Sequence, residues 1–235
     1  MSESILKVDG VKKSFGGVHA LRGCFLEVKR NKIYGLIGPN GSGKTTLFQT
    51  ISGMEKIDEG KVIFDNEDIT GMRPSRIYHK GFARTFQLSR VFPDLTVLEN
   101  LMVASRRGDK GAEERALNLL NKVNLTSHRY VKGIHLSYGQ KRLVEFLRVL
   151  MCEPSLILLD EPAAGVNPTL RKVLWELVLH LNSLGATFLI IEHNMKVIED
   201  LCHQVYVMNE GRVIASGTPQ EIRGNQSVIE AYFGK

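Results

Sequence analysis

Eight consecutive residues of this chain have the types and the spacing of a phosphate-binding loop. The segment 38–45 reads GPNGSGKT, which fits the pattern of glycine, four variable residues, glycine, lysine and threonine. Its glycines allow successive backbone N–H groups to point toward one centre, where they can hold phosphate oxygens. Lys44 can then reach the β- and γ-phosphates of a nucleotide, and the Thr45 hydroxyl can bind Mg²⁺. The residues expected to contact the nucleotide here are Gly38, Pro39, Asn40, Gly41, Ser42, Gly43, Lys44, Thr45 and Thr46.

A pair of carboxylates, Asp160 and Glu161, follows directly after the apolar run 156–159. A strand of this kind carries Asp160 to the carboxyl end of a parallel sheet, where ligands bind in α/β folds. Asp160 can there hold the coordination shell of Mg²⁺, and Glu161 can polarise an attacking water. The alternative is a buried strand that ends in a solvated acidic turn. The phosphate loop in the same chain favours the metal-binding interpretation.

The segments around these residues predict alternating strands and helices. The apolar segment 33–37 precedes the phosphate loop and a helix-like segment, 45–51, follows it, which is the context that such a loop requires. The runs 156–159 and 187–191 lack polar alternation, which is typical of strands buried on both faces of a parallel sheet. Further strands are predicted at 5–8, 24–28 and 62–64, and a hairpin at 205–208 and 212–215. The region 97–151 is predicted to be helical, and separate helices are predicted at 112–123, 136–151 and 168–184.

The length and composition fit one large α/β domain or two small ones. The chain has 235 residues, of which 43% are hydrophobic and 24% charged, and its net charge of +6 does not by itself indicate nucleic-acid binding. Cys24, Cys152 and Cys202 are odd in number and widely spaced, which predicts reduced, buried thiols in a cytosolic protein. The first residues lack the pattern of a signal peptide, and no apolar run approaches the roughly 18 residues that span a bilayer. We therefore expect any role at a membrane to depend on a partner.

The segment 136–140, LSYGQ, is similar to the LSGGQ signature of ABC ATPases, and it precedes Asp160 as it does in that family. Other motifs of the family occur in its order: Phe15 matches the aromatic residue that stacks on adenine, Gln87 the Q-loop glutamine, 164–167 the D-loop, and His193 the switch histidine. The resemblance covers nearly the whole chain. It implies an α/β fold with a P-loop, RecA-like core, a mostly parallel sheet and an N-terminal antiparallel β-subdomain. A helical subdomain at about 88–150 would be inserted into this single domain, 1–235.

The resemblance also implies the cofactors ATP and Mg²⁺ and a role for each matched residue. The implied metal site contains Thr45, Gln87 and Asp160, and the implied catalytic residues are Lys44, Gln87, Glu161 and His193. Ser137, Gly139 and Gln140 would bind the γ-phosphate of an ATP held by the opposite subunit. The active unit would then be a head-to-tail dimer, with itself or with a homologous subunit, that encloses two ATP molecules.

Several of these residues also have a simpler structural interpretation. Ser137 can cap the helix that follows it with no ligand bound, and Gln87 can be a surface glutamine. A lone histidine at a strand end, such as His193, is more often structural, and an aromatic residue such as Phe15 usually belongs to the core.

Two positions depart from the general pattern of the family. Tyr138 replaces a glycine of the signature, and Asn167 replaces the usual aspartate of the D-loop. Asparagine keeps the hydrogen-bonding capacity but removes the charge, so coupling between the two nucleotide sites could be altered.

Longer segments resemble the ATPases of branched-chain amino-acid importers; they are 81–87, 91–101, 161–168, 191–195 and 228–234. In such importers the region corresponding to 88–101 contacts membrane-spanning permease subunits, and we expect Phe92, Leu95 and Val97 to form an exposed apolar patch there. The resemblance thus implies a cytoplasmic protein bound peripherally to the inner face of the cell membrane.

Alternative functions within the family are export of lipid or lipopolysaccharide and a soluble role such as iron–sulfur cluster assembly. No nucleic-acid partner is expected, because the chain has neither the long heptad run of DNA-repair members nor the two cassettes of translation factors. The segment 71–90 has no acidic residue, which predicts either a basic face near the membrane or, slightly favoured, a solvated helix face. Its basic residues are Arg73, Arg76, Lys80, Arg84 and Arg90.

Overall fold

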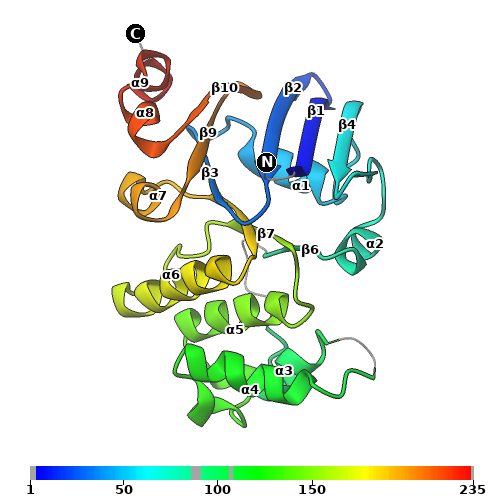
Figure 1. Cartoon of the computed structure of the whole chain (residues 1–235), viewed down its shortest axis with the longest axis vertical. Helices are drawn as coiled ribbons and strands as arrows, with labels where there is room; N and C mark the ends of the chain where they lie inside the picture. The colour runs from blue at the N-terminus through cyan, green and yellow to red at the C-terminus, as the bar shows by residue number, and fades with distance from the viewer. Residues whose placement is uncertain (1–3, 86–90, 106–107, 234–235) are drawn as a thin grey trace.

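The computed structural model describes residues 4–85, 91–105 and 108–233, and its centre is a six-stranded sheet (Figure 1). The strand order is β10-β9-β3-β8-β7-β6. The strands from β9 to β6 are parallel, and β10 at one edge is antiparallel to β9. This arrangement confirms the mostly parallel sheet and the hairpin predicted from the sequence. The strands are β3 (Ile33–Ile37), β6 (Phe82–Arg84), β7 (Leu156–Asp160), β8 (Thr187–Ile191), β9 (Gln204–Asn209) and β10 (Arg212–Gly217).

A second, antiparallel sheet is built from the N-terminal part of the chain, as predicted, with the order β2-β1-β4-β5. β1 and β2 have 12 residues each and are much longer than the predicted segments 5–8 and 24–28. The reason is that register shifts between Val8 and Val11, with Gly10 at φ +59°, break the alternation of apolar residues. The strands are β1 (Ser4–Phe15), β2 (Val18–Lys29), β4 (Glu59–Phe64) and β5 (Glu67–Asp68).

Helix α1 (Lys44–Ile51) packs between the two sheets. Its Phe48 belongs to a hydrophobic cluster that joins the antiparallel sheet to one face of the parallel sheet. In β7, Leu158 belongs to this cluster, whereas Leu159 belongs to the cluster on the other face. Because side chains alternate along a strand, Asp160 lies on the same face as Leu158, which is the face that α1 covers.

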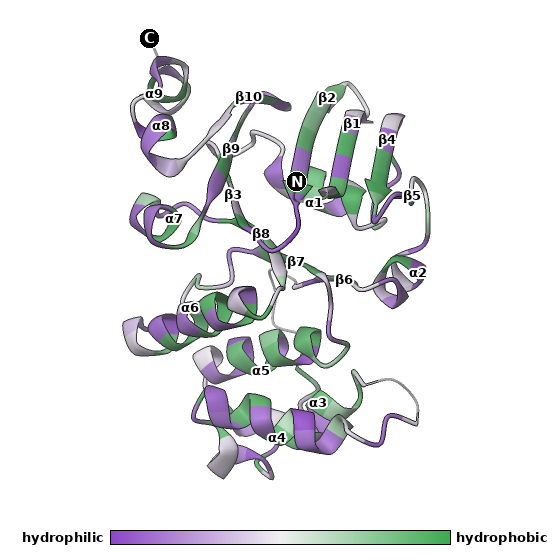
Figure 2. Cartoon of the chain, viewed as in Figure 1, coloured by the Kyte–Doolittle hydropathy of each residue, from purple (hydrophilic) through white to green (hydrophobic). Residues whose placement is uncertain are grey.

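Helices α3 (Val97–Met102), α4 (Ala112–Lys122) and α5 (Tyr138–Leu150) lie together at the end of the molecule opposite the antiparallel sheet (Figure 1). A large hydrophobic cluster joins them to α6 (Pro168–Ser183) and to β7 and β8. Figure 2 shows both hydrophobic and hydrophilic residues along α4 and α5, in agreement with amphipathic helices that bury one face. The helices predicted at 112–123, 136–151 and 168–184 are confirmed to within two residues at each end.

Four further helices in the described residues are short and were not predicted, because a few residues do not establish a helical period. They are α2 (Pro74–His79), α7 (Met195–Leu201), α8 (Pro219–Arg223) and α9 (Gln226–Phe233), with single 3₁₀ turns at Thr126–His128 and Gly133–His135. None of the helices in the described part of the chain is both long and apolar enough to cross a membrane.

Two predictions about burial have different outcomes. Cys24, Cys152 and Cys202 are buried, as predicted. The expected apolar patch is wrong in one of its members, because Val97 is fully buried where α3 packs into the core, whereas Phe92 is 42% exposed.

Candidate functional site

The phosphate loop connects β3 to α1, and its surroundings require glycine at two positions. A Cβ atom on Gly38 would lie 2.1 Å from the carbonyl oxygen of Met208, and one on Gly43 would lie 2.6 Å from that of Ala20. Both glycines have a positive φ, +148° and +100°, which side chains rarely tolerate. Gly43 is also the N-cap of α1, where no side chain caps the first N–H groups of the helix. These N–H groups can therefore bind an anion.

Lys44 is buried and its ammonium group lies against the loop itself. Nζ donates hydrogen bonds to the carbonyl oxygens of Gly38 and Pro39, at 2.8 and 2.9 Å, and to Ser42 Oγ at 3.4 Å. Burial lowers the pKa of Lys44, and the nearby carboxylates of Glu161 and Asp160 act in the opposite direction. The lysine is thus a positive charge fixed at the centre of the loop, as phosphate binding requires.

A cavity of about 720 Å³ opens over the phosphate loop. Its lining brings Lys44 and Thr45 together with Glu161 and His193, which are far apart in the sequence. A cavity of this volume is in the range of sites that hold small molecules and cofactors. The structure therefore gathers most of the predicted phosphate-binding residues and three of the four predicted catalytic residues around one space.

Asp160 ends β7 and is completely buried. Its Oδ2 accepts a hydrogen bond from Arg84 Nη2 at 3.0 Å, while Oδ1 has no hydrogen-bond partner among the described residues. Burial raises the pKa of Asp160, and the Arg84 guanidinium opposes this change. An unpaired buried oxygen of this kind costs about 1–3 kcal/mol, which a bound cation would relieve.

The residues present fit Mg²⁺ rather than a metal held by protein ligands alone. Within the described ranges no three His, Cys, Asp or Glu side chains cluster in a way that could hold a metal ion. Mg²⁺ usually takes only one or two carboxylates and completes its shell with phosphate oxygens and water. Asp160 with its unpaired Oδ1, and Thr45 in the adjacent cavity, match this donor set.

Glu161 and His193 form a hydrogen-bonded pair at the carboxyl ends of two neighbouring strands. His193 Nε2 lies 2.8 Å from Glu161 Oε1, and both side chains are partly exposed to the cavity. Glu161 has φ +46°, an unusual conformation for a residue with a side chain, and its N–H donates to the carbonyl oxygen of Ile191. This turn directs the carboxylate away from the end of β7 and toward His193. A histidine with only a structural role at the end of a strand would not need this contact with Glu161.

The signature segment forms a helix start at some distance from this cavity. Ser137 Oγ accepts a hydrogen bond from the Gln140 N–H at 3.3 Å, and Gln140 Oε1 accepts one from the Ser137 N–H at 2.9 Å. This reciprocal cap of α5 is the structural role that the sequence allows for Ser137. A Cβ on Gly139 would lie 2.7 Å from Leu170 Cδ1, the end of a flexible side chain that could move aside. None of these signature residues lines the cavity over the phosphate loop.

Other predicted residues lie apart from the cavity or outside the described residues. Phe15 is 45% exposed, so the alternative of a core position does not apply, and stacking on adenine stays a prediction. Gln87 lies outside the described residues. Asn167 caps α6 through its Oδ1, which accepts a hydrogen bond from the Leu170 N–H at 2.9 Å. The amide at this D-loop position therefore has a structural function of its own.

Arg84 lies in surroundings that differ from the sequence-based expectation. The sequence predicts that Arg84, with Arg73 and Arg76, lies either on a basic face near a membrane or, slightly favoured, on a solvated helix face, and the other two arginines are indeed exposed. The Arg84 side chain is instead 8% exposed and paired with Asp160. The local charge pattern could not reveal this, because the contact depends on the pairing of β6 with β7.

Comparison with known protein families gives two matches. Residues 21–164 match the family described as ABC transporter. Residues 212–235 match the family described as branched-chain amino acid ATP-binding cassette transporter.

Curated relatives match along their whole length. The "High-affinity branched-chain amino acid transport ATP-binding protein LivG" of Escherichia coli (strain K12) is 37% identical over 254 aligned positions, which cover 100% of both chains. The protein BraF of Pseudomonas aeruginosa, with the same description, is 39% identical over the same coverage.

Solved structures of ATP-binding cassettes have the same fold. A nucleotide-free cassette from an ABC transporter matches with a TM-score of 0.90 at 36% identity, covering 99% of this chain and 100% of the other. The ADP conformation of the cassette MJ1267 matches with a TM-score of 0.89, also at 36% identity, over 100% of both chains. A dimeric cassette, MJ0796 bound to ADP and Pi, matches with a TM-score of 0.81 at 26% identity, covering 91% of this chain and 98% of that one.

Proposed function

Because this chain belongs to the ATP-binding subunits of ABC transporters, which are ATPases, we propose that it hydrolyses ATP to drive import of branched-chain amino acids. The observation that carries the chemical part of this proposal is the cavity in which Lys44, Thr45, Glu161 and His193 meet. The solute is supported by the descriptions of the full-length relatives LivG and BraF.

Nucleotide binding in this proposal depends on the phosphate loop. The uncapped N–H groups of α1 and the ammonium group of Lys44 hold the β- and γ-phosphates. Thr45 and Asp160 would hold Mg²⁺, which neutralises charge on the phosphates when it is bound. Gln87 stays a proposed member of this group.

Hydrolysis in this proposal depends on Glu161 and His193. Glu161 orients a water molecule and accepts its proton as the oxygen attacks the γ-phosphorus in line with the leaving oxygen. His193 holds the Glu161 carboxylate through the 2.8 Å hydrogen bond, and its N–H can donate to the γ-phosphate instead when ATP is bound. Lys44 stabilises the charge that develops on the leaving group.

A dimer completes the proposed site. Ser137, Gly139 and Gln140 lie away from the phosphate loop of their own chain, so they are proposed to contact the γ-phosphate bound by a second subunit. The N-terminus of α5, a helix of 13 residues, supplies N–H groups for this contact. The similarity to a dimeric cassette supports the same arrangement.

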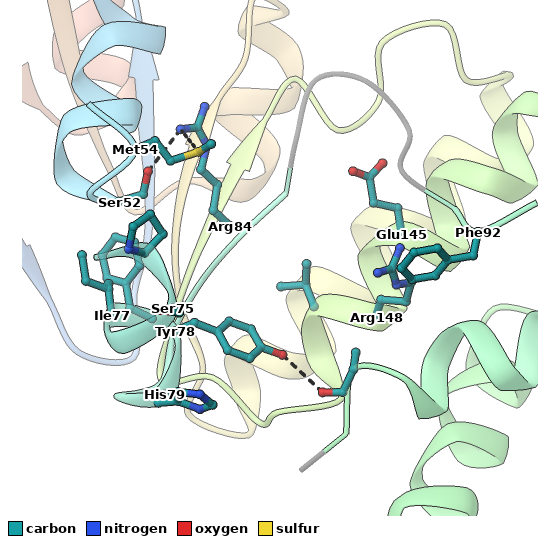
Figure 3. Close-up of a pocket in the computed structure, with 14 residues that line it drawn as sticks. Ser52, Met54, Ser75, Ile77, Tyr78, His79, Arg84, Phe92, Glu145 and Arg148 are labelled. Carbon is teal, nitrogen blue, oxygen red and sulfur yellow. Dashed lines mark hydrogen bonds between the residues drawn. The ribbon is translucent and has the colours of Figure 1, made fainter. Parts of the chain in front are cut away.

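The proposed permease site is a second cavity, of about 550 Å³, between the end of β6 and α5 (Figure 3). Figure 3 shows α2 with Ile77 and Tyr78 on one side of it, and Phe92, Glu145 and Arg148 on the other. An apolar lining with a few charged groups suits a short amphipathic helix of a membrane subunit. The inner face of the cell membrane is the proposed location.

The test of this function is purification of the tagged protein from its native membrane in mild detergent, followed by identification of the partners. We expect two multi-span permease subunits, and ATPase activity that rises with a branched-chain amino acid and its binding protein. Phe92→Ser should weaken recovery of the permease, whereas Phe25→Ser, which changes an exposed ring on β2 outside the cavity, should not.

Three results would each contradict a different part of this proposal. Recovery of soluble partners alone would favour a role such as iron–sulfur assembly. Recovery of permeases whose ATPase responds to lipid or lipopolysaccharide would favour export. Equal recovery with both phenylalanine variants would refute the proposed docking cavity but would leave the ATPase chemistry intact.

A further inference from the structure

Arg84 lies on the same face of the sheet as the candidate metal ligand Asp160. In the parallel pairing of β6 with β7, Arg84 is opposite Leu158, and Asp160 is two residues beyond Leu158. Because side chains on one face recur every second residue, the Arg84 side chain extends along β7 toward Asp160. Its Nη2 donates to Asp160 Oδ2 at 3.0 Å.

The Arg84 guanidinium is held in place by the end of α1. Nη1 donates to Ser52 Oγ at 3.2 Å, and Ser52 Oγ donates to the carbonyl oxygen of Phe48 at 2.6 Å. The Arg84 Cζ atom also lies 5.7 Å from the centre of the Phe48 ring. The planar group therefore bridges α1 and β7, which carry the two halves of the candidate metal site, Thr45 and Asp160.

The hydrogen bond from Arg84 involves only one of the two oxygens of the Asp160 carboxylate. Oδ2 is occupied by the guanidinium, while Oδ1 has no hydrogen-bond partner among the described residues. An ion pair with a purely structural role in the interior is expected to satisfy both oxygens. The arrangement instead fixes the carboxylate and leaves one oxygen for another ligand.

We propose that Arg84 is a positioning residue that orients Asp160 so that Oδ1 faces the Mg²⁺ of the bound nucleotide. The proposal rests on the proposed function, because it takes Asp160 as a residue of the metal site. Arg84 also lines the cavity proposed for the permease, and Figure 3 shows it at the edge of that cavity with its contacts to Ser52 and Met54. A helix seated in the cavity would thus touch the side chain that orients the metal ligand.

The test compares ATP affinity with Mg²⁺ and with EDTA, by titration of a fluorescent ATP analogue, in Arg84→Lys and Arg84→Met. We expect the gain in affinity that Mg²⁺ gives to fall about tenfold in Arg84→Met and less in Arg84→Lys, because lysine keeps the charge but loses the planar fork. Affinity in EDTA should stay within about twofold, since the phosphate loop is unchanged. Arg76→Met, which removes an exposed arginine of α2, should change neither affinity.

Asp160→Asn separates failure of this inference from failure of the proposed metal site. If Asp160→Asn keeps the full gain from Mg²⁺, the proposed role of Asp160 is wrong and the role of Arg84 falls with it. If Asp160→Asn loses the gain while both Arg84 variants keep it, only the Arg84 inference is overturned. Equal losses with and without Mg²⁺ would show that Arg84 acts only on folding. Should Arg84→Met fail to fold, Arg84→Lys carries the test, with circular dichroism as the check.

Discussion

Replacement of Glu161 by glutamine separates the chemistry of the site from its folding. Glutamine has nearly the same size as glutamate and, like glutamate, must adopt the φ of +46° at this turn, so the backbone strain is the same in both proteins. The change alters one hydrogen-bonded pair, in which the Glu161 side chain is 27% exposed and the His193 side chain 40% exposed. Pairs of this exposure contribute about 0–1 kcal/mol, so the free energy of unfolding should change by no more than that.

The effect on turnover should be far larger. An amide can accept a hydrogen bond from water, but it cannot take the proton that the attack on the γ-phosphorus releases. Loss of a general base typically slows a reaction by about 10²–10⁴-fold, which corresponds to roughly 3–5 kcal/mol of barrier. Affinity for ATP should stay the same, because the groups proposed to hold the phosphates, Lys44 and the N–H groups of α1, are unchanged.

The assay measures phosphate release at saturating ATP and, separately, binding of a fluorescent ATP analogue. Glu176→Gln is the matched control, because it makes the same chemical change at an exposed residue of α6 that pairs with Lys172. The control should keep its turnover. Turnover of Glu161→Gln within about tenfold of the unmodified protein would refute the role given to Glu161.

Three further predictions concern the loop, the thiols and the signature helix. Gly38→Ala should lower the free energy of unfolding by more than about 2 kcal/mol in urea titrations, because its Cβ would overlap the backbone. Gly41→Ala should lower it less, because its Cβ would meet nothing within 4 Å. Equal losses in the two variants would contradict this prediction. Burial raises the pKa of Cys24 to about 11 and that of Cys202 to about 12. At any pH below these values, only a small fraction of each thiol is therefore present as thiolate. At about pH 8 the reaction with iodoacetamide should be slower in the folded than in the unfolded protein, by roughly a hundredfold for Cys24 and roughly a thousandfold for Cys202. Similar rates by mass spectrometry would contradict their burial. Ser137→Ala should cost about 1 kcal/mol in thermal unfolding through the lost cap while ATP binding to the isolated subunit is unchanged, and weaker binding would place Ser137 at its own chain's nucleotide.

The sequence predicted where the candidate site residues lie along the chain, but it did not predict which of them contact one another in the fold. Apolar runs correctly placed Asp160 and His193 after buried strands, because continuous hydrophobic segments are a direct consequence of burial on both faces. That Glu161 and His193 form a pair depends on β7 and β8 being neighbours in the sheet. Strand order is decided by packing over the whole domain, and no local pattern contains it.

In the antiparallel sheet, the pattern of apolar residues underestimated the lengths of two strands. Its strands β1 and β2 have one exposed face, which carries Val18 and Phe25 as well as polar residues, and register shifts near Gly10 interrupt their alternation. Only the most apolar part of each strand was therefore predicted. The pairing between neighbouring strands, rather than the composition of either one, extends them to 12 residues.

Arg84 shows why a count of charges along a segment cannot decide which of them is functional. Arg76 and Arg84 lie in the same basic segment, yet one is exposed on α2 and the other is buried. The difference arises from strand pairing, which sets Arg84 opposite Leu158 on the face that also carries Asp160. A buried arginine must find a partner, and Asp160 is within its reach. It follows that the same side chain contacts the candidate metal ligand and lines the cavity proposed for the permease.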